Sequence, residues 1–232
     1  MKKEFEMSMV GELTFFLGLQ VKQKKEGIFV LQEKYARNIF KKLGLDSKKH
    51  ASTPMSSSTK LNVDSSGVEV SPTLYRSIIG SLLYLTASRP DIAFSVGVCT
   101  RYQATPKESH LTAVKRIIRY INGTPDYDLW HSKDSNACLA GYSDADWASN
   151  VDDRKSTSGG WFYLGNNLVS WMSKKQNSVS LSTAKAEYIA ARSCCTQLLW
   201  MKKLLHDYGI PQDTMCVFCD NISVINLSKN PV

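Results

Sequence analysis

Apolar positions in the first fifty residues follow one spacing and then another. Two apolar runs, at residues 15–19 and 28–31, flank the polar turn Lys25-Glu26-Gly27. A glycine in such a turn is typical of a β-hairpin, which we place at residues 11–30. A helix that ends at Gly44 is predicted next. Its apolar residues recur every three or four positions: Tyr35, Ile39, Phe40 and Leu43.

A polar stretch separates this part from a helical one. From residue 47 to residue 71 the chain is rich in Ser, Thr, Asp, Lys and Gly, which indicates a linker and not a packed element. Helical spacing then predicts three helices, at residues 74–87, 90–101 and 106–122. The last has a basic side, which fits contact with a phosphate backbone or, more commonly, a solvated outer face.

After Gly123 the pattern is typical of strands. Short apolar runs predict four strands, at residues 138–142, 161–164, 168–172 and 215–219. A long helix lies between the third and the fourth strand; Ser182 or Thr183 can cap its start, and Gly209 marks its end. A final helix opens at Ser223. This succession predicts a mixed α/β fold.

Composition excludes several classes of protein. With 232 residues, 43% of them hydrophobic, the chain is long enough for one or two domains and too apolar for general disorder. No apolar run approaches the roughly 18 residues of a membrane span, so we expect no membrane partner. No signal-type apolar core follows the first residues, and the six cysteines are therefore expected to be reduced thiols.

The positive charge lies mainly near the N-terminus. The net charge is +8, and residues 1–50 carry eleven Lys and Arg against six acids. Such a region is compatible with a polyanionic partner. A solvated surface that keeps the protein soluble explains the charge equally well.

Three acidic residues are the strongest candidates for chemistry. Asp144 and Asp220 each end a predicted strand, and Glu187 lies in the first turn of the helix between them. If the strands are neighbours, the three carboxylates converge, and Mg²⁺ prefers such oxygen ligands. Acids at strand ends are common, however. Asp144 as a turn residue and Asp220 as a cap of the last helix explain the spacing at least as well.

Other reactive or aromatic residues give weaker indications. Cys216-x-x-Cys219 fits a zinc chelate, but without a second such pair we favour packed core thiols. The four histidines form no spaced pair. Four tryptophans could stack on bases, although core positions are more usual for them: Trp147, Trp161, Trp171 and Trp200.

The acidic residues lie within longer motifs. These are Gly141-Tyr142-Ser143-Asp144-Ala145-Asp146-Trp147-Ala148, Asp153-Arg154-Lys155-Ser156-Thr157-Ser158-Gly159, Ser180-Leu181-Ser182-Thr183-Ala184-Lys185-Ala186-Glu187-Tyr188 and Cys219-Asp220-Asn221. Together they resemble the ribonuclease H domain of Copia-type retrotransposon Pol polyproteins. Phe16-Leu17-Gly18-Leu19, near the N-terminus, resembles the primer-grip hairpin of the reverse transcriptase. Three further motifs resemble its thumb and connecting region: residues 75–85, 89–92 and 115–124.

The resemblance implies a division of the chain and a site. The implied parts are a primer-grip hairpin and thumb start (1–50), a linker (51–71), a helical thumb and connection region (72–135) and a ribonuclease H-like mixed sheet with flanking helices (136–232). Two Mg²⁺ ions, or Mn²⁺ as a substitute, would hydrolyse the RNA strand of an RNA–DNA hybrid. Asp144 would bridge both ions, and Glu187 and Asp220 would help hold the second. Asp146 would support the turn.

The resemblance also implies partners and missing parts. The remainder of the Pol polyprotein would be a partner, in a cytoplasmic particle or the nucleus. The polymerase's Tyr-x-Asp-Asp segment would precede Gly11, so we expect no polymerisation by this chain alone. A fourth ribonuclease H carboxylate would lie beyond Val232. We therefore expect a C-terminally truncated, degenerate remnant with weak or absent cleavage. The alternative is a non-catalytic nucleic-acid-binding module.

Overall fold

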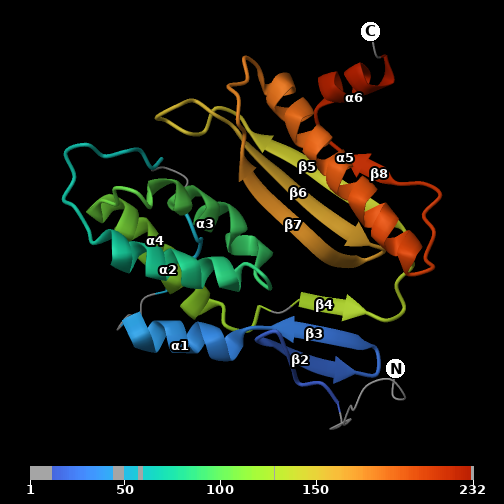
Figure 1. Ribbon diagram of the computed structural model, residues 1–232, viewed down its shortest axis with the longest axis horizontal. Coiled ribbons are helices and arrows are strands. Elements are labelled where there is room, and N and C mark those ends of the chain that lie inside the picture. Colours follow the sequence, from blue (N-terminus) through green and yellow to red (C-terminus); the bar gives the residue numbers. More distant parts are fainter. Residues whose placement is uncertain (1–11, 44–49, 57–59, 128, 231–232) are drawn as a thin grey trace.

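The computed structural model describes residues 12–43, 50–56, 60–127 and 129–230 (Figure 1). Within these residues the chain has two four-stranded sheets and six α-helices, so the prediction of a mixed α/β structure is confirmed. Figure 1 shows the helices that precede residue 124 gathered on one side and the second sheet, crossed by a long helix, on the other. The predicted start of the hairpin at Gly11 and the predicted end of the first helix at Gly44 lie outside the described residues.

The first sheet joins distant parts of the chain. Its antiparallel strands, in spatial order, are β1 (Phe15–Phe16), β2 (Leu19–Lys24), β3 (Gly27–Leu31) and β4 (Leu129–Ser132). The predicted hairpin turn at residues 25–27 is confirmed. A second turn, at Leu17 and Gly18, has positive φ at both residues (49° and 82°). A two-residue hairpin turn of type I′ requires this. The strand β4 was not predicted; it lies within the segment 72–135, whose other described elements are helical.

The helices of the first part share one core. They are α1 (Glu33–Leu43), α2 (Pro72–Leu85), α3 (Ala93–Cys99) and α4 (Glu108–Gly123), with 3₁₀ turns η1 (Pro90–Ile92) and η2 (Thr100–Tyr102) on either side of α3. The three predicted helical segments are thus confirmed. Ile39 and Phe40 of α1 and Val96 of α3 belong to this core. Its largest completely buried side chains come from α2, η1 and α4: Tyr75, Ile79, Leu82, Leu85, Ile92, Ile117, Ile118 and Ile121.

The segment 60–71 is packed, which corrects the prediction that it belongs to a linker. Its backbone is irregular, but Leu61 lies against the helical core. The Tyr102 hydroxyl donates to the Leu61 carbonyl oxygen at 3.0 Å. Nε2 of buried His110 lies 2.7 Å from the Asn62 carbonyl oxygen, and its Nδ1 accepts from the Lys107 N–H at 2.9 Å. One imidazole therefore ties the segment to the start of α4.

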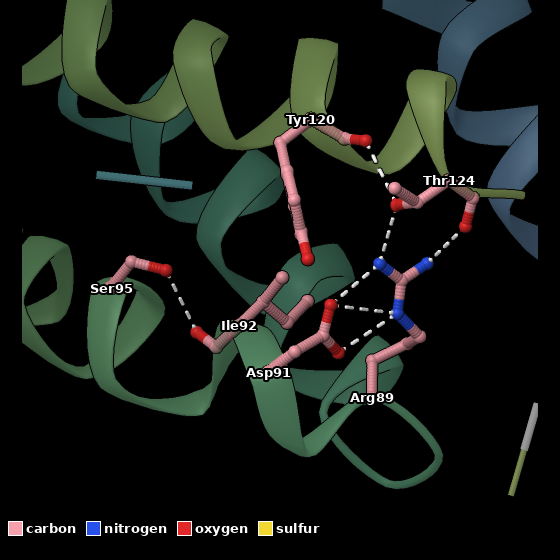
Figure 2. Close-up of polar contacts among 6 residues, drawn as sticks. All are labelled: Arg89, Asp91, Ile92, Ser95, Tyr120 and Thr124. Carbon is pink, nitrogen blue, oxygen red and sulfur yellow. Dashed lines mark hydrogen bonds and ion pairs between the residues drawn. The ribbon is translucent and has the colours of Figure 1, made fainter. Parts of the chain in front are cut away.

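Arg89 joins η1 to the end of α4. Its side chain is buried, and its guanidinium donates to the Asp91 carboxylate (2.7 Å) and to the Thr124 carbonyl (2.8 Å) and hydroxyl (2.7 Å) oxygens (Figure 2). The same group lies 5.7 Å from the ring centre of Tyr120. A planar fork with five N–H donors suits such a convergence of acceptors.

The second sheet carries the acidic motifs. Its strands, in spatial order, are β7 (Asn167–Lys175), β6 (Thr157–Leu164), β5 (Leu139–Asp146) and β8 (Cys216–Phe218). The first three pair antiparallel, whereas β8 is parallel to β5. The long helix α5 (Thr183–Asp207) crosses one face, and α6 (Ile222–Lys229) follows β8 (Figure 1). The four predicted strands are confirmed, but β5, β6 and β7 are longer than expected.

Hydrogen bonds hold the helical part against the second sheet. Asn167, at the start of β7, accepts from the Ser132 N–H (2.7 Å) and donates to the Ser132 carbonyl oxygen (3.0 Å). The Trp171 indole donates to the Thr86 carbonyl oxygen just after α2 (2.9 Å). Arg101 donates to the Thr157 hydroxyl (2.7 Å). The acidic motifs therefore belong to a sheet that is fixed on its β7 side.

Candidate functional site

Topology brings the candidate acids to one edge of the second sheet. Because β5 and β8 are parallel and adjacent, their carboxyl ends meet at the same edge. Asp144 belongs to β5 and pairs with Gly159 of β6. We predicted that Asp144 ends this strand, but β5 continues to Asp146. Asp220 lies two residues beyond β8.

Local capping sets the position of Glu187. The Ser182 hydroxyl accepts from the Lys185 N–H at 3.2 Å, and so caps α5, as predicted. Glu187 therefore lies in the second turn of α5, not in the first. Its side chain faces the sheet and is 7% exposed.

The alternative explanations of the two aspartates do not hold. Asp144 is a strand residue, not a turn residue. Asn221, rather than Asp220, caps α6, because its side-chain oxygen accepts from the Val224 N–H at 3.2 Å. The carboxylate of Asp220 is therefore available for another role.

Glu187 has one satisfied and one unsatisfied oxygen. Oε1 accepts a hydrogen bond from the Ala145 N–H at 3.1 Å. Oε2 is buried and has no hydrogen-bond partner among the described residues. Burial raises the pKa of Glu187 above its ordinary value, and the negative charges of Asp144 and Asp220 raise it further, against the opposing effect of the Ala145 N–H. Each of these causes except the hydrogen bond favours the binding of a cation or a proton.

Cys219 belongs to the same cluster, which the sequence reasoning did not foresee. One ligand atom each from Glu187, Cys219 and Asp220 lie within 4.8 Å of one another. Burial raises the pKa of the Cys219 thiol, as do the neighbouring carboxylates. In the sequence, the indication of its place in the cluster is its position directly before Asp220.

The predicted core positions of the cysteine pair and the tryptophans are largely wrong. Cys216 is exposed and Cys219 half-buried. Trp147, Trp161 and Trp200 are exposed. For Trp161, the reason is that the sheet has one face under α5 and one open face, and Trp161 lies on the open one. Trp200 belongs to α5 itself, and Trp147 follows the end of β5.

The open face is a shallow aromatic hollow beside the acids. It has a volume of about 860 Å³, and its lining includes Asp144 and Asp220. Aromatic side chains cover much of it: Tyr142, Trp161, Tyr163 and Phe218. The Tyr142 ring stacks on that of Phe218, with centroids 4.8 Å apart. Exposed aromatic rings in a hollow can stack on planar ligands such as nucleobases.

The acidic cluster fits a divalent cation. Carboxylate oxygens are the ligands that Mg²⁺ and Mn²⁺ accept. Oε2 of Glu187 is a buried acceptor without a partner among the described residues, and one oxygen of this carboxylate lies within 4.8 Å of an Asp220 oxygen. Asp144 acts on Glu187 electrostatically and lines the same hollow as Asp220. Asp146 instead acts electrostatically on Arg101. Burial lowers the pKa of Arg101, and the charge of Asp146 partly opposes this effect.

Comparisons with known proteins cover the whole chain. It is 36% identical to the retrovirus-related Pol polyprotein from transposon RE2 of Arabidopsis thaliana over 100% of its length. It is 36% identical to the corresponding polyprotein from transposon TNT 1-94 of Nicotiana tabacum over 99% of its length. An uncharacterized mitochondrial protein of Arabidopsis thaliana is 36% identical over 84% of this chain and 81% of its own length. No family model matches the chain, and no solved structure matches it significantly.

These similarities define the class of protein. The chain belongs to the family of Pol polyproteins of Copia-type retrotransposons. It corresponds to a fragment, since it spans 16% of the length of the RE2 polyprotein. In the described part of the chain, no helix is both long and apolar enough to cross a bilayer.

Proposed function

We propose that this chain comprises the C-terminal region of a reverse transcriptase followed by a ribonuclease H-like domain. In the intact polyprotein, this domain would hydrolyse the RNA strand of an RNA–DNA hybrid during reverse transcription. The observation that carries the proposal is that Glu187 and Asp220 lie together at one sheet edge beside Asp144, and that Glu187 has a buried oxygen without a partner among the described residues. The sequence similarity to Pol polyproteins supports it.

The arrangement of the second sheet supports the assignment of the domain. Three antiparallel strands are followed by a helix and a parallel strand, and this order brings Asp144 and Asp220 to neighbouring strands. The helix between them supplies Glu187. A ribonuclease H-like fold requires this convergence from three separate motifs.

Each acid has a distinct place in the proposed chemistry. Glu187 is held by the Ala145 N–H, and its carboxylate lies beside that of Asp220. Asp144 opens on the aromatic hollow, where a substrate phosphate would lie. When bound there, Mg²⁺ or Mn²⁺ ions would activate the attacking water and stabilise the leaving oxygen.

The chain by itself is expected to bind hybrid and to leave it uncleaved. Among the described residues, the charges that act on Glu187 are those of Asp144 and Asp220, with no fourth acid. Three carboxylates supply few ligands for two ions about 4 Å apart. The sequence also contains no Tyr-x-Asp-Asp segment, so polymerisation is not proposed for it.

The exposed aromatic hollow favours a second candidate function, a non-catalytic module that binds nucleic acid. Tyr142, Trp161 and Phe218 are about half exposed beside the acids, and the chain carries a net charge of +8. In that case the acids would merely repel phosphate. Asp144→Asn would then leave binding equal or stronger, with and without Mg²⁺.

The test is an assay of cleavage and binding on one end-labelled RNA–DNA hybrid, in Mg²⁺ or Mn²⁺. We expect salt-dependent binding and an intact RNA strand. Asp213→Asn is the control, because it removes an exposed acid outside the site. Cleavage that Asp144→Asn abolishes would refute the expected inactivity and support the site. A chain with a native circular dichroism spectrum that does not bind hybrid would refute the proposal.

A further inference from the structure

We propose that Glu187, Cys219 and Asp220 form a cation site of mixed sulfur and oxygen donors that binds Zn²⁺ in preference to Mg²⁺. Cys219 is the ligand that gives the preference. The inference rests on the proposed function in one respect, namely that a cation binds between Glu187 and Asp220. It adds a thiolate to that site and a competing metal.

The first observation is the state of Glu187. This side chain is more than nine-tenths buried, and its Oε2 has no hydrogen-bond partner within the described part of the chain. Nor does any Lys, Arg or His of the described residues form an ion pair with it. A buried carboxylate oxygen without a partner is unfavourable, because nothing replaces the hydration that it has lost. A bound cation would satisfy it.

The second observation is the distance between the donors. One ligand atom from each of the three residues lies within 4.8 Å of the other two. Zinc binds sulfur at about 2.3 Å and carboxylate oxygen at about 2.0–2.2 Å, so a sulfur and an oxygen donor at the tetrahedral angle lie about 3.6 Å apart. Small side-chain rotations therefore suffice to close the site.

The chemistry of sulfur decides which metal the site prefers. Mg²⁺ is a hard cation that takes oxygen ligands and retains waters, so a thiolate adds little to its binding affinity. Zn²⁺ binds thiolate, imidazole and carboxylate, and it lies near the top of the affinity order of divalent metals. Cys219 is half-buried and Asp220 is exposed, so the outer side of the site is open to water or a substrate oxygen.

The other cysteines provide a matched control. Cys216 lies three residues before Cys219 and is exposed, but it is not part of the cluster. Cys216→Ser therefore removes a thiol from the preceding strand, β8, without touching the site. Cys219→Ser keeps the size of the side chain and an oxygen, but loses the soft donor.

The experiment titrates the complete chain with Co²⁺ alone and then competes it with Zn²⁺ or Mg²⁺. Sulfur-to-cobalt charge-transfer absorption reports a thiolate ligand directly. We expect this band in the wild type and in Cys216→Ser, and its loss in Cys219→Ser. The concentration of Zn²⁺ that displaces Co²⁺ should be at least about one hundred times lower than the concentration of Mg²⁺ that does so. In Cys219→Ser, Zn²⁺ affinity should fall about 10–100-fold, and Mg²⁺ affinity should not change.

The outcomes separate this inference from the proposed function. A band that persists in Cys219→Ser or disappears in Cys216→Ser would overturn the assignment of Cys219. Binding of Mg²⁺ that requires Glu187 and Asp220, without any thiolate band, would overturn the inference and leave the proposed function standing. A folded chain that binds none of the three metals would overturn both.

Discussion

The backbone N–H of Ala145 donates a 3.1 Å hydrogen bond to Oε1 of Glu187. This contact joins the end of β5 to the second turn of α5, whereas Oε2 of the same carboxylate is buried and has no hydrogen-bond partner among the described residues. One oxygen thus fixes the side chain and the other is left for a ligand. The stability of the metal-free protein should reflect this arrangement.

Replacement of Glu187 by Gln should make the stability of the metal-free protein less sensitive to pH. Burial first, and then Asp144 and Asp220, raise the pKa of Glu187 in the folded state above the ordinary 4.5. The wild type therefore has the full stabilising contribution below pH 4.5 and loses it as the pH rises through the folded pKa. Urea denaturation in EDTA should find Glu187→Gln more stable than the wild type at neutral pH, where the wild type has lost this contribution. A variant less stable than the wild type at neutral pH would contradict this.

Gly141 should tolerate no side chain, because α5 packs directly on it. A Cβ there would lie 2.7 Å from Cys194 Sγ and 3.0 Å from Leu198 Cδ1. We expect Gly141→Ala to destabilise the fold by about 1–3 kcal/mol in thermal or urea unfolding. The control is Gly80→Ala in the middle of α2, where a Cβ would meet nothing within 4 Å. It should stabilise by about 0.5–1 kcal/mol, and equal effects of the two substitutions would refute the described packing.

Arg89 should not be replaceable by lysine. A lysine cannot reach Asp91 and both oxygens of Thr124 at once, as the guanidinium does (Figure 2). Arg89→Lys is expected to cost about 1–3 kcal/mol in the free energy of unfolding. Arg37→Lys is the comparison, since Arg37 forms an exposed pair with Glu33 and should change stability by less than about 0.5 kcal/mol. Equal free energies of unfolding for the two variants would show that the buried network contributes no more to stability than the exposed pair.

The aromatic hollow should contribute to the binding of nucleic acid. Trp161 is exposed beside Asp144 and Asp220, and base stacking on such a ring is worth about 1–3 kcal/mol. Fluorescence anisotropy with a labelled hybrid should find this loss in Trp161→Ala. Trp200→Ala, an exposed tryptophan on α5, should bind like the wild type. An equal loss in the two variants would indicate a contact elsewhere.

Local signals in the sequence predicted much of the fold. The turn at residues 25–27, the cap at Ser182 and the end of α5 near Gly209 depend on neighbours a few positions away, and all are present. The strand β4 could not be found this way, because it is short and its partner β3 lies about a hundred residues earlier. The packing of Leu61 likewise depends on Tyr102, far along the chain.

The candidate site could be predicted only in part. The motifs indicated Asp144, Glu187 and Asp220, but the length of β5 and the turn of α5 on which Glu187 lies required the structure. The inclusion of Cys219 depends on how β8 approaches α5 in space. The exposure of Trp161 depends on which face of the sheet α5 covers, and strand alternation alone leaves this undecided.

The central claim is that Asp144, Glu187 and Asp220 hold a divalent cation against nucleic acid. The most direct measurement is the affinity of the wild type and of Asp144→Asn for an uncleaved RNA–DNA hybrid, with Mg²⁺ and with EDTA. We predict that Mg²⁺ strengthens binding by the wild type about tenfold, or about 1.4 kcal/mol, and has no effect on Asp144→Asn. In EDTA the variant should bind more tightly, because it repels phosphate less. Equal responses of the two proteins to Mg²⁺ would contradict the account.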